Sequence, residues 1–500
     1  MAAVCNLLTR SHPWVDADEG IYLVIGRDLG SERLPYRDFW DNHMPGIYAE
    51  TWVLTRLGLP LGALRLVAGL AWLACLYPVA RAWRFPTGGA GLAMAALPAA
   101  VILHPALNGE SLYTEYGEGC ALLLALAALV AAERAAGVWP GAGWCVLAGF
   151  LSAVAISFRP TAALYGPPLL WLAVWAARAA RPRALPAAAF VLGAAGGLGL
   201  LILALASAGL LGDCLQLVGG ANARITGTID LAHNLRGWGV LVAGVLGMGF
   251  VVVLARRGAP WLREHHPRAA TAATWLVVTA FVEALLPRKG WPHYLLPAFC
   301  FMLPFGWAAL AGADPGRPPR RPGLLVGLLV LALCYSLGWA GVVVARWASP
   351  GPREVYGVSL PRLRGYLRPG DTVWSGGTRG ADLYWYTGHP SATRYVYASS
   401  GAEQSGIRGD VLLGDLRASR PRLVLIGPQW LDADGELAAE APAGLRAYLA
   451  GAYVREAGRP GAGQSAAQGD EAQPPGLRDL GPSRRAAAVF VRRDAAARPR

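Results

Sequence analysis

Ten segments of this chain are apolar over the length that a helix needs to cross a lipid bilayer. Because the hydrocarbon core is about 30 Å thick, such a helix needs about 20 predominantly apolar residues. The chain is 54% hydrophobic and 15% charged, with a mean hydropathy of +0.37, which is unusual for a soluble globular protein. We therefore expect a polytopic α-helical membrane protein with spans at residues 63–82, 89–106, 118–134, 140–158, 161–178, 186–211, 238–256, 270–286, 294–310 and 323–346.

Arginine residues gather in every second loop between the predicted spans. Because short loops rich in Lys and Arg stay in the cytoplasm, we expect all of these loops on one side of the membrane. The acidic N-terminal segment, the loop at 108–117 and the C-terminal region then lie outside. The formal net charge of +13 reflects topology and attraction to anionic lipid, and no nucleic-acid partner is predicted. The arginines are Arg81, Arg84, Arg134, Arg178, Arg181, Arg183, Arg256, Arg257, Arg263, Arg268, Arg317, Arg320 and Arg321.

This pattern divides the chain into three parts. Residues 1–62 form an external first loop, which includes a segment at 47–59 that is too polar to span and is expected to lie at the membrane interface. Residues 63–346 form the transmembrane domain, and residues 347–500 form a small external α/β domain. An external first loop with a cytoplasmic N-terminus needs a span before it, so we expect that a first helix is missing. The alternative is an N-terminus that is itself external.

The sequence pattern after residue 346 is typical of a small α/β domain. Short segments rich in Thr, Val, Tyr and Trp alternate there with glycine-rich turns, which is typical of strands. The segment at 458–483 is rich in Gly, Pro, Gln and Ala and is expected to be a mobile loop. We expect a helix at 410–418 and strands at 371–374, 382–386, 393–397 and 422–427, with a closing edge strand at 487–492.

Charged and aromatic residues are concentrated at 16–46. A chain embedded in lipid has little structural need for such a cluster. Asp18 and Glu19 occur there just before the aromatic Tyr22. A carboxylate held near apolar groups at the membrane surface can be tuned into a general base. The alternative is that these acids belong to an ordinary solvated loop.

The second half of this stretch reads PYRDFWDNHMPG, at residues 35–46. Trp40 and its aromatic neighbours offer stacking surfaces for a sugar ring, although such rings also form aromatic belts at membrane interfaces. Arg37 can pair either with a phosphate or with Asp38. His43 adds a titratable cation. We expect all four side chains to contact substrate.

Two further loops on the predicted outer side carry polar residues. The loop at 104–118 places Glu115 at the mouth of a span, where the helix dipole alone also favours a carboxylate. Arg159 lies at the outer end of another span, where it could equally snorkel to the interface. External acids and cations together suit an anionic lipid-linked donor, because cations hold the phosphate while a carboxylate deprotonates an acceptor. The third loop, at 287–297, supplies Arg288, Lys289, His293 and Tyr294, which could also be interfacial anchors.

The sequence DADEGIYLVIGRDLGSERLPYRDFWDNHMPGIY resembles the first external loop of bacterial glycosyltransferases that use polyprenyl-phosphate sugars. These belong to the membrane glycosyltransferase clan GT-C, which includes the protein O-mannosyltransferase and aminoarabinose transferase families. Their signature is an Asp-Glu pair, a Pro-Tyr-Arg-Asp stretch and a Lys-Pro-Pro-Gly-like stretch. Here the last of these reads His43-Met44-Pro45-Gly46. The resemblance also extends to Glu115 and to the HYLLP segment at 293–297.

The resemblance implies roles for particular residues. Asp18 would be the catalytic carboxylate, Glu19 its partner and Glu115 the second acidic position. The cations that would bind the lipid phosphate are Arg159, Arg288 and Lys289. The spans hold few charges away from their ends, and Glu283 is the nearest to an exception.

These features predict a glycosyltransferase that moves a sugar from a polyprenyl-phosphate carrier to a hydroxyl on a cell-envelope glycan, lipid or protein. Asp18 would act as general base at the external face, and the configuration would invert. The alternatives are a transporter or flippase for a lipid-linked sugar, and a non-catalytic envelope scaffold. A carrier should bury ionisable residues near the bilayer midplane, which favours the enzyme. No residues have the spacing of metal ligands, so no cofactor is predicted, and divalent-metal dependence stays open.

Overall fold

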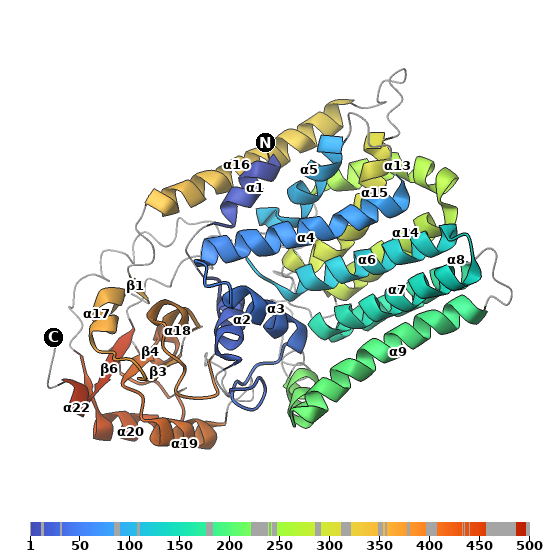
Figure 1. Cartoon of the computed structure of the whole chain (residues 1–500). Coiled ribbons are helices and arrows are strands. Elements are labelled where there is room, and N and C mark those ends of the chain that lie inside the picture. The colour runs from blue at the N-terminus through green and yellow to red at the C-terminus, as the bar shows by residue number, and fades with distance from the viewer. Residues whose placement is uncertain are drawn as a thin grey trace.

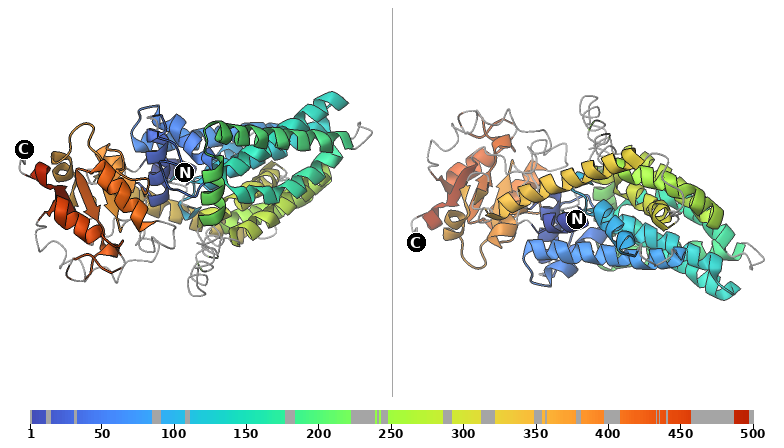
Figure 2. Two further views of the ribbon diagram at one scale, coloured as in Figure 1. Left: turned by 90° about the horizontal axis from the view of Figure 1, so that it is seen from below. Right: turned by 90° about the horizontal axis from the view of Figure 1, so that it is seen from above.

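The computed structural model places two bodies side by side, a bundle of long helices and a smaller body built around a sheet (Figure 1). Figure 2 shows from two further directions that N-terminal helices, in blue, lie where the two bodies meet. The structure describes residues 2–11, 15–30, 33–84, 91–107, 111–176, 184–221, 239, 242, 248–285, 292–311, 322–348, 354–355, 358–377, 381–396, 408–432, 434, 436–439, 441–456 and 487–496.

Six segments of the described chain are long and apolar enough to cross a membrane. Each coincides with a predicted span, so the chain is a membrane protein, as its composition predicts. The six are α4 (Leu61–Trp83), α6 (Thr114–Arg134), α7 (Val138–Phe158), α9 (Ala184–Ser207), α14 (Pro267–Leu285) and the segment His293–Leu310, which contains most of α15 (Leu296–Ala311).

The other four predicted spans differ in form. The span predicted at 238–256 lies mostly outside the described residues, and α13 (Gly249–His265) covers only its end. The remaining three spans correspond to α5 (Gly91–Ile102), to η2 (Pro160–Tyr165) followed by α8 (Gly166–Ala176), and to α16 (Pro322–Ala348).

Short helical turns connect several elements: η1 (Pro105–Leu107), α10 (Leu211–Cys214), the π-helical η3 (Leu215–Ala221) and η4 (Pro292–Leu295).

Helix α6 lies inside the bundle and packs against α4, α7, α8 and α15. Of its most apolar 18-residue window 89% is buried within the protein, whereas the corresponding value for α9 is 28%. A helix that is apolar on every side is stable only where protein or lipid surrounds it completely. Helix α6 therefore occupies an inner position in the bundle, and α9 occupies a position that faces lipid.

Glycines allow α7 and α9 to approach closely. A Cβ atom built on Gly193 would lie 2.0 Å from the carbonyl oxygen of Val146, and one on Gly149 would lie 1.9 Å from that of Phe190. In lipid, where no hydrophobic force drives helices together, such close backbone packing is a main source of association. These two glycines therefore set the distance between α7 and α9.

The first loop contains two helices, α2 (Ala17–Asp28) and α3 (Pro45–Thr55), preceded by the short α1 (Ala2–Thr9). Helix α2 begins with a capping box, in which the Asp16 side chain accepts from the backbone of Asp18 and the Glu19 side chain accepts from that of Asp16. Helix α3 begins at a proline, which suits a first helical position. It occupies most of the segment that was predicted to lie at the interface.

The smaller body contains a four-stranded sheet in the order β3-β4-β6-β5. Strands β3 (Val373–Gly376) and β4 (Leu423–Ile426) are parallel, and β6 (Ala488–Arg492) pairs antiparallel with both β4 and β5 (Tyr453–Arg455). A separate pair of two-residue strands, β1 (Glu354–Val355) and β2 (Val358–Ser359), precedes it. The helices of this body are α17 (Leu360–Gly365), α18 (Ala381–Thr387), α19 (Gly409–Ser419), α20 (Leu445–Ala452) and α22 (Arg493–Ala496), with the short turn η5 (Pro428–Trp430).

Two strand predictions in this region were wrong, and a third strand forms as predicted but at another place in the sheet. Residues 382–386 are helical, because α18 buries Ala381, Leu383 and Tyr384 and packs against α2. The described residues of 393–397 form no strand. The predicted edge strand at 487–492 is an inner strand, since β5, which was not predicted, pairs with its other side. The helix at 410–418 and the strand at 422–427 are confirmed, and the loop at 458–483 lies outside the described residues.

A side chain at Gly193 is expected to push α7 and α9 apart. We predict that Gly193→Ala lowers the unfolding temperature in detergent, because overpacking a tight contact typically costs about 1–3 kcal/mol. Gly199→Ala is the matched control, since it lies on the same helix and a Cβ there meets nothing within 4 Å. Thermal denaturation of both variants checks this, and equal effects would contradict the role of Gly193.

Candidate functional site

Glu19 lies in a fully buried ion pair with Arg65 of α4. Arg65 Nε donates to Glu19 Oε1 over 2.7 Å and Arg65 Nη2 donates to Oε2, while neither side chain is exposed. The backbone N–H of Leu112 donates to the same carboxylate over 3.1 Å, and that of Asp16 over 3.3 Å. Buried charges are tolerated when their hydrogen-bonding capacity is satisfied in this way. Glu19 therefore connects α2, α4 and the segment before α6.

Asp18, one residue earlier, is placed differently. Its side chain is partly exposed, and within the described part of the chain its carboxylate has no ion-pair or hydrogen-bond partner. Its backbone N–H donates to Oδ1 of Asp16 over 3.1 Å, which holds the start of α2 in place. Among the described residues, the carboxylate of Glu19 is therefore occupied, whereas that of Asp18 is not.

Tyr22 is a buried residue of α2 whose ring packs against that of His43. Burial raises the pKa of Tyr22 well above its usual value, and the carboxylates of Asp18, Asp41 and Glu115 raise it further. The sequence indicated Tyr22 only as an aromatic neighbour of Asp18. Its spacing of four residues, which puts both on one face of a helix, was the available signal.

Asp41 orients His43 in the same region. The buried carboxylate of Asp41 accepts from Tyr48 Oη over 2.7 Å and lies 3.0 Å from His43 Nδ1. Because a carboxylate can only accept, Nδ1 carries the proton. Burial acts to raise the pKa of Asp41, but His43 and the hydrogen bonds to this carboxylate bring it below its usual value. The rings of His43 and Tyr22 are nearly perpendicular, with 4.9 Å between their centroids.

Arg159 lies at the centre of a buried group that we call the arginine cluster: Arg159, Glu115, Glu118 and Glu283. Its Nη1 atom lies 3.2 Å from Glu115, 3.4 Å from Glu118 and 3.4 Å from Glu283. One guanidinium therefore faces three carboxylates. From the sequence, Glu115 and Arg159 were expected in separate loops and Glu283 had no assigned role, although an acid near the end of an apolar span was a signal for it.

The third predicted loop adds His293 and Tyr294 to this cluster. His293 Nε2 lies 3.9 Å from Glu115, and its ring stacks on Tyr113 with 4.2 Å between centroids. The Arg159 guanidinium lies over the Tyr294 ring, 4.7 Å from its centroid. The two other predicted residues of this loop lie outside the described residues, namely Arg288 and Lys289.

The other residues of the first loop that were predicted to contact substrate are bonded within the loop or to the sheet body. The carboxylate of Asp38 accepts from the backbone N–H of Leu34 over 2.9 Å and pairs with Arg37 over 2.9 Å. The backbone N–H of Trp40 donates to the carbonyl of Arg394 over 2.7 Å. These residues, in this structure, hold the loop in shape and attach it to the sheet body.

No group of three His, Cys, Asp or Glu side chains among the described residues is placed to hold a metal ion. The nearest approach to such a group is the arginine cluster. There the Nη1 atom of Arg159 occupies the space between the three carboxylates, within 3.4 Å of each. The positive charge of the guanidinium takes the place that a cation would occupy.

No protein-family model and no curated protein matches this chain. Among solved structures, ArnT from Cupriavidus metallidurans bound to undecaprenyl phosphate has 14% sequence identity and a TM-score of 0.56, covering 85% of this chain and 92% of its own. Its apo state has a TM-score of 0.54, 14% identity and coverages of 85% and 91%. The apo oligosaccharyltransferase from Archaeoglobus fulgidus has a TM-score of 0.50, 12% identity and coverages of 85% and 68%.

At these identities the similarity establishes the fold. The chain has the GT-C architecture, a polytopic helical bundle with a small sheet domain, as the resemblance in its first loop predicted.

The ion pair of Glu19 and Arg65 should be essential for stability. We predict that Glu19→Gln destabilises the protein by about 3–5 kcal/mol, because it leaves the charge of Arg65 buried without a counter-charge. Adding Arg65→Met should recover much of this loss. Thermal unfolding in detergent checks both variants. A single variant that unfolds at the wild-type temperature would show that Glu19 has no such role.

Asp16 should make stability depend on pH. Burial, together with the charges of Asp18 and Glu19, raises the pKa of Asp16 from 3.8 to about 6. A raised pKa means that ionising this carboxylate opposes folding, so its destabilising effect develops as pH rises from about 4 to about 6 and persists above that.

We therefore predict that Asp16→Asn, which keeps a capping oxygen, stabilises the protein by about 1–3 kcal/mol near neutral pH and has little effect near pH 4. Unfolding temperatures of wild type and variant across this pH range check the prediction. An equal gain at both ends of the range would point to the cap and not to the charge.

Proposed function

We propose that this protein is a membrane glycosyltransferase that moves a sugar from a polyprenyl-phosphate carrier to a hydroxyl acceptor at the external face. The observation that carries the proposal is that three loops, far apart in sequence, meet at buried carboxylates: Glu19 accepts from the backbone N–H of Leu112 over 3.1 Å, and Glu115 lies 3.9 Å from His293. ArnT, which shares the fold, is known in complex with undecaprenyl phosphate, and this supports a lipid-linked donor.

Asp18 is the proposed general base. Its carboxylate is partly exposed and has no partner among the described residues, so it can accept a proton from an acceptor hydroxyl. The oxygen of that hydroxyl then attacks the anomeric carbon in line, which inverts the configuration. Glu19 is proposed to act by holding α2, because its own carboxylate is occupied by Arg65.

The leaving group is a lipid phosphate that departs already charged, so the reaction needs cations more than a strong acid. We propose that Arg288 and Lys289 bind this phosphate, together with His43, whose ring is oriented by Asp41. Arg159 is engaged by three carboxylates, and it could bind phosphate only by exchanging one of them. Tyr294, against Arg159, is the proposed contact for the sugar ring.

The distribution of charge along the bundle supports an external site. At the C-terminal end of α6, Arg134 donates to the carbonyl of Ala82 and lies 3.1 Å from His266. Arg268 pairs with Glu133 over 3.6 Å at the same end. Basic helix ends therefore gather where the positive-inside rule predicts the cytoplasm, while Glu115 lies at the opposite end of α6.

The positions of the acids also bear on the alternatives. A transporter or flippase would place ionisable residues near the middle of the membrane. In this chain Glu115 and Glu118 belong to the first turns of α6, and Glu283 belongs to the last turn of α14. These positions at helix ends favour an enzyme. A non-catalytic envelope scaffold is separated from it by a transfer assay.

Asp18→Asn should abolish transfer without unfolding the protein. We predict a loss of about 10²- to 10⁴-fold in the transfer rate, the usual contribution of a general base, with unchanged binding of the lipid donor. The measurement is transfer of radiolabel from a panel of polyprenyl-phosphate sugars to cell-envelope extract. Asp410→Asn, which alters an exposed Arg–Asp pair, is the control.

Two outcomes would contradict this proposal. Wild-type turnover by Asp18→Asn would remove Asp18 from the mechanism. Folded, membrane-inserted wild-type protein that transfers none of the sugars, but moves the lipid-linked sugar across vesicle membranes, would favour the transporter.

A further inference from the structure

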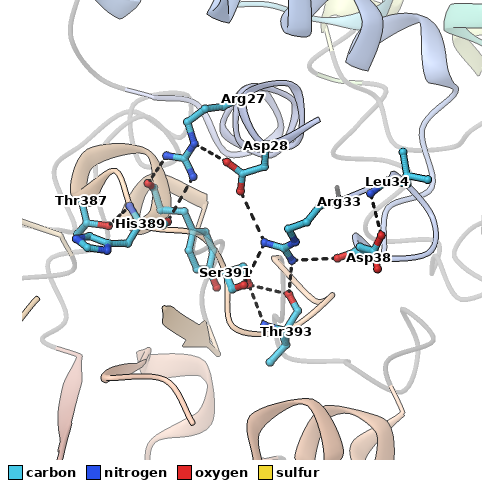
Figure 3. Close-up of polar contacts among 10 residues, drawn as sticks. Arg27, Asp28, Arg33, Leu34, Asp38, Thr387, His389, Ser391 and Thr393 are labelled. Carbon is cyan, nitrogen blue, oxygen red and sulfur yellow. Dashed lines mark hydrogen bonds and ion pairs between the residues drawn. The ribbon is translucent and has the colours of Figure 1, made fainter. Parts of the chain in front are cut away.

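Three residues that the proposed reaction does not use form a compact group at the end of α2. We call them the arginine clamp: Arg27, Asp28 and Arg33. Asp28 pairs with Arg27 Nε over 2.7 Å and lies 3.7 Å from Arg33 Nη1. Figure 3 shows the two guanidinium groups on either side of the carboxylate, with the sheet body beneath them.

The clamp faces backbone carbonyls of the sheet body. Arg27 donates to the carbonyls of Tyr384 over 2.9 Å and His389 over 3.4 Å. Arg33 donates to those of Ser391 over 3.2 Å and Thr393 over 3.5 Å. The acceptors are uncharged and belong to one short segment. Because a guanidinium presents five donors in a fixed plane, a single arginine can bridge several such oxygens.

Arg33 also holds the turn that leads into the proposed site. Its Nη2 atom donates to the carbonyl of Asp38 over 3.1 Å, and its guanidinium lies over the Phe39 ring, 4.2 Å from the centroid. Within this turn Tyr36 has a φ of +68°, a left-handed conformation that is unfavourable for a large side chain. Such a turn persists only when its surroundings hold it. Two residues after Phe39 the chain reaches Asp41.

The sheet body contacts the first loop at further points. The backbone N–H of Trp40 donates to the carbonyl of Arg394 over 2.7 Å, just after the turn. At the other end of α2, the N–H of Val15 donates to Tyr386 Oη over 2.8 Å. A Cβ built on Gly20 would lie 3.0 Å from the Cβ of Ala381, which shows how closely α18 packs on α2. Helix α2 is therefore held by the sheet body at both ends.

We infer that the C-terminal sheet body positions the first loop for catalysis, and that Arg33 is the positioning residue through which it does so. Among the described contacts of the clamp, only those of Arg33 reach the sheet body, the end of α2 and the turn before Asp41 and His43. The inference rests on the proposed function for its catalytic consequence. The docking itself does not depend on that function.

The test compares Arg33→Gln and Arg33→Lys with wild type in the full-length protein. Lysine keeps the positive charge but lacks the planar guanidinium group, so it should preserve only part of the contact between the first loop and the sheet body. The control is Arg408→Gln, which removes an exposed Arg–Asp pair of the same body. Hydrogen exchange reports docking directly, because the N–H of Trp40 is bonded across the contact. The amides of β4 report whether the sheet remains folded.

In Arg33→Gln we expect Trp40 exchange to be at least about tenfold faster, with β4 unchanged. We expect kcat/KM for the donor to fall by at least about tenfold, because the turn that Arg33 holds leads to His43, a proposed phosphate ligand, and a misplaced group loses rate. Arg33→Lys should be intermediate in both, and Arg408→Gln should match wild type.

Unchanged exchange at Trp40, or faster exchange with unchanged kcat/KM, would overturn the inference. A raised donor KM with unchanged exchange would also overturn it, since Arg33 would then contact substrate. A wild-type protein without transfer activity would refute the proposed function and with it the catalytic part of the inference, whereas the exchange data would still decide whether Arg33 docks the loop.

Discussion

The ion pair between Glu19 and Arg65 connects parts of the molecule that would otherwise be independent. Glu19 belongs to the first loop, Arg65 belongs to a transmembrane helix, and the N–H of Leu112 completes the carboxylate's hydrogen bonds. Removing two charges from water is unfavourable in itself, so the pair is stable only when all three segments are in place. As a result the first loop is held on the bundle, while the neighbouring Asp18 remains partly exposed.

Lipid imposes a second constraint, which separates the bundle into a middle and two ends. Close glycine contacts such as Gly193 against Val146 pack the middle, where polar groups are costly. Ionisable side chains gather at the ends, with basic residues such as Arg134 at one and the arginine cluster at the other. The sheet body then covers part of the first loop at the acidic end. Arg134, Glu115 and Glu283 thus lie near helix ends, where charges are less costly than at the midplane of a bilayer.

The sequence predicted much of the fold, because a membrane span depends on a local property, the length of an apolar run. The same local reasoning failed in the sheet body. The segment at 382–386 is rich in strand-forming aromatics, yet it forms α18 because its apolar face packs against Gly20 of α2. The last strand was expected at an edge, and β5 on its far side makes it an inner strand. Both errors concern partners that are distant in sequence.

The candidate site shows the same division. The sequence by itself predicted a membrane protein with the GT-C fold, and it indicated Asp18, Glu19, Glu115 and Arg159 as candidate site residues through their motif and their places at span ends. Only the tertiary structure decided which acid is occupied and which is available, and that Glu283 joins Arg159. The reason is physical: the state of a carboxylate depends on the donors around it, and here those donors come from other helices.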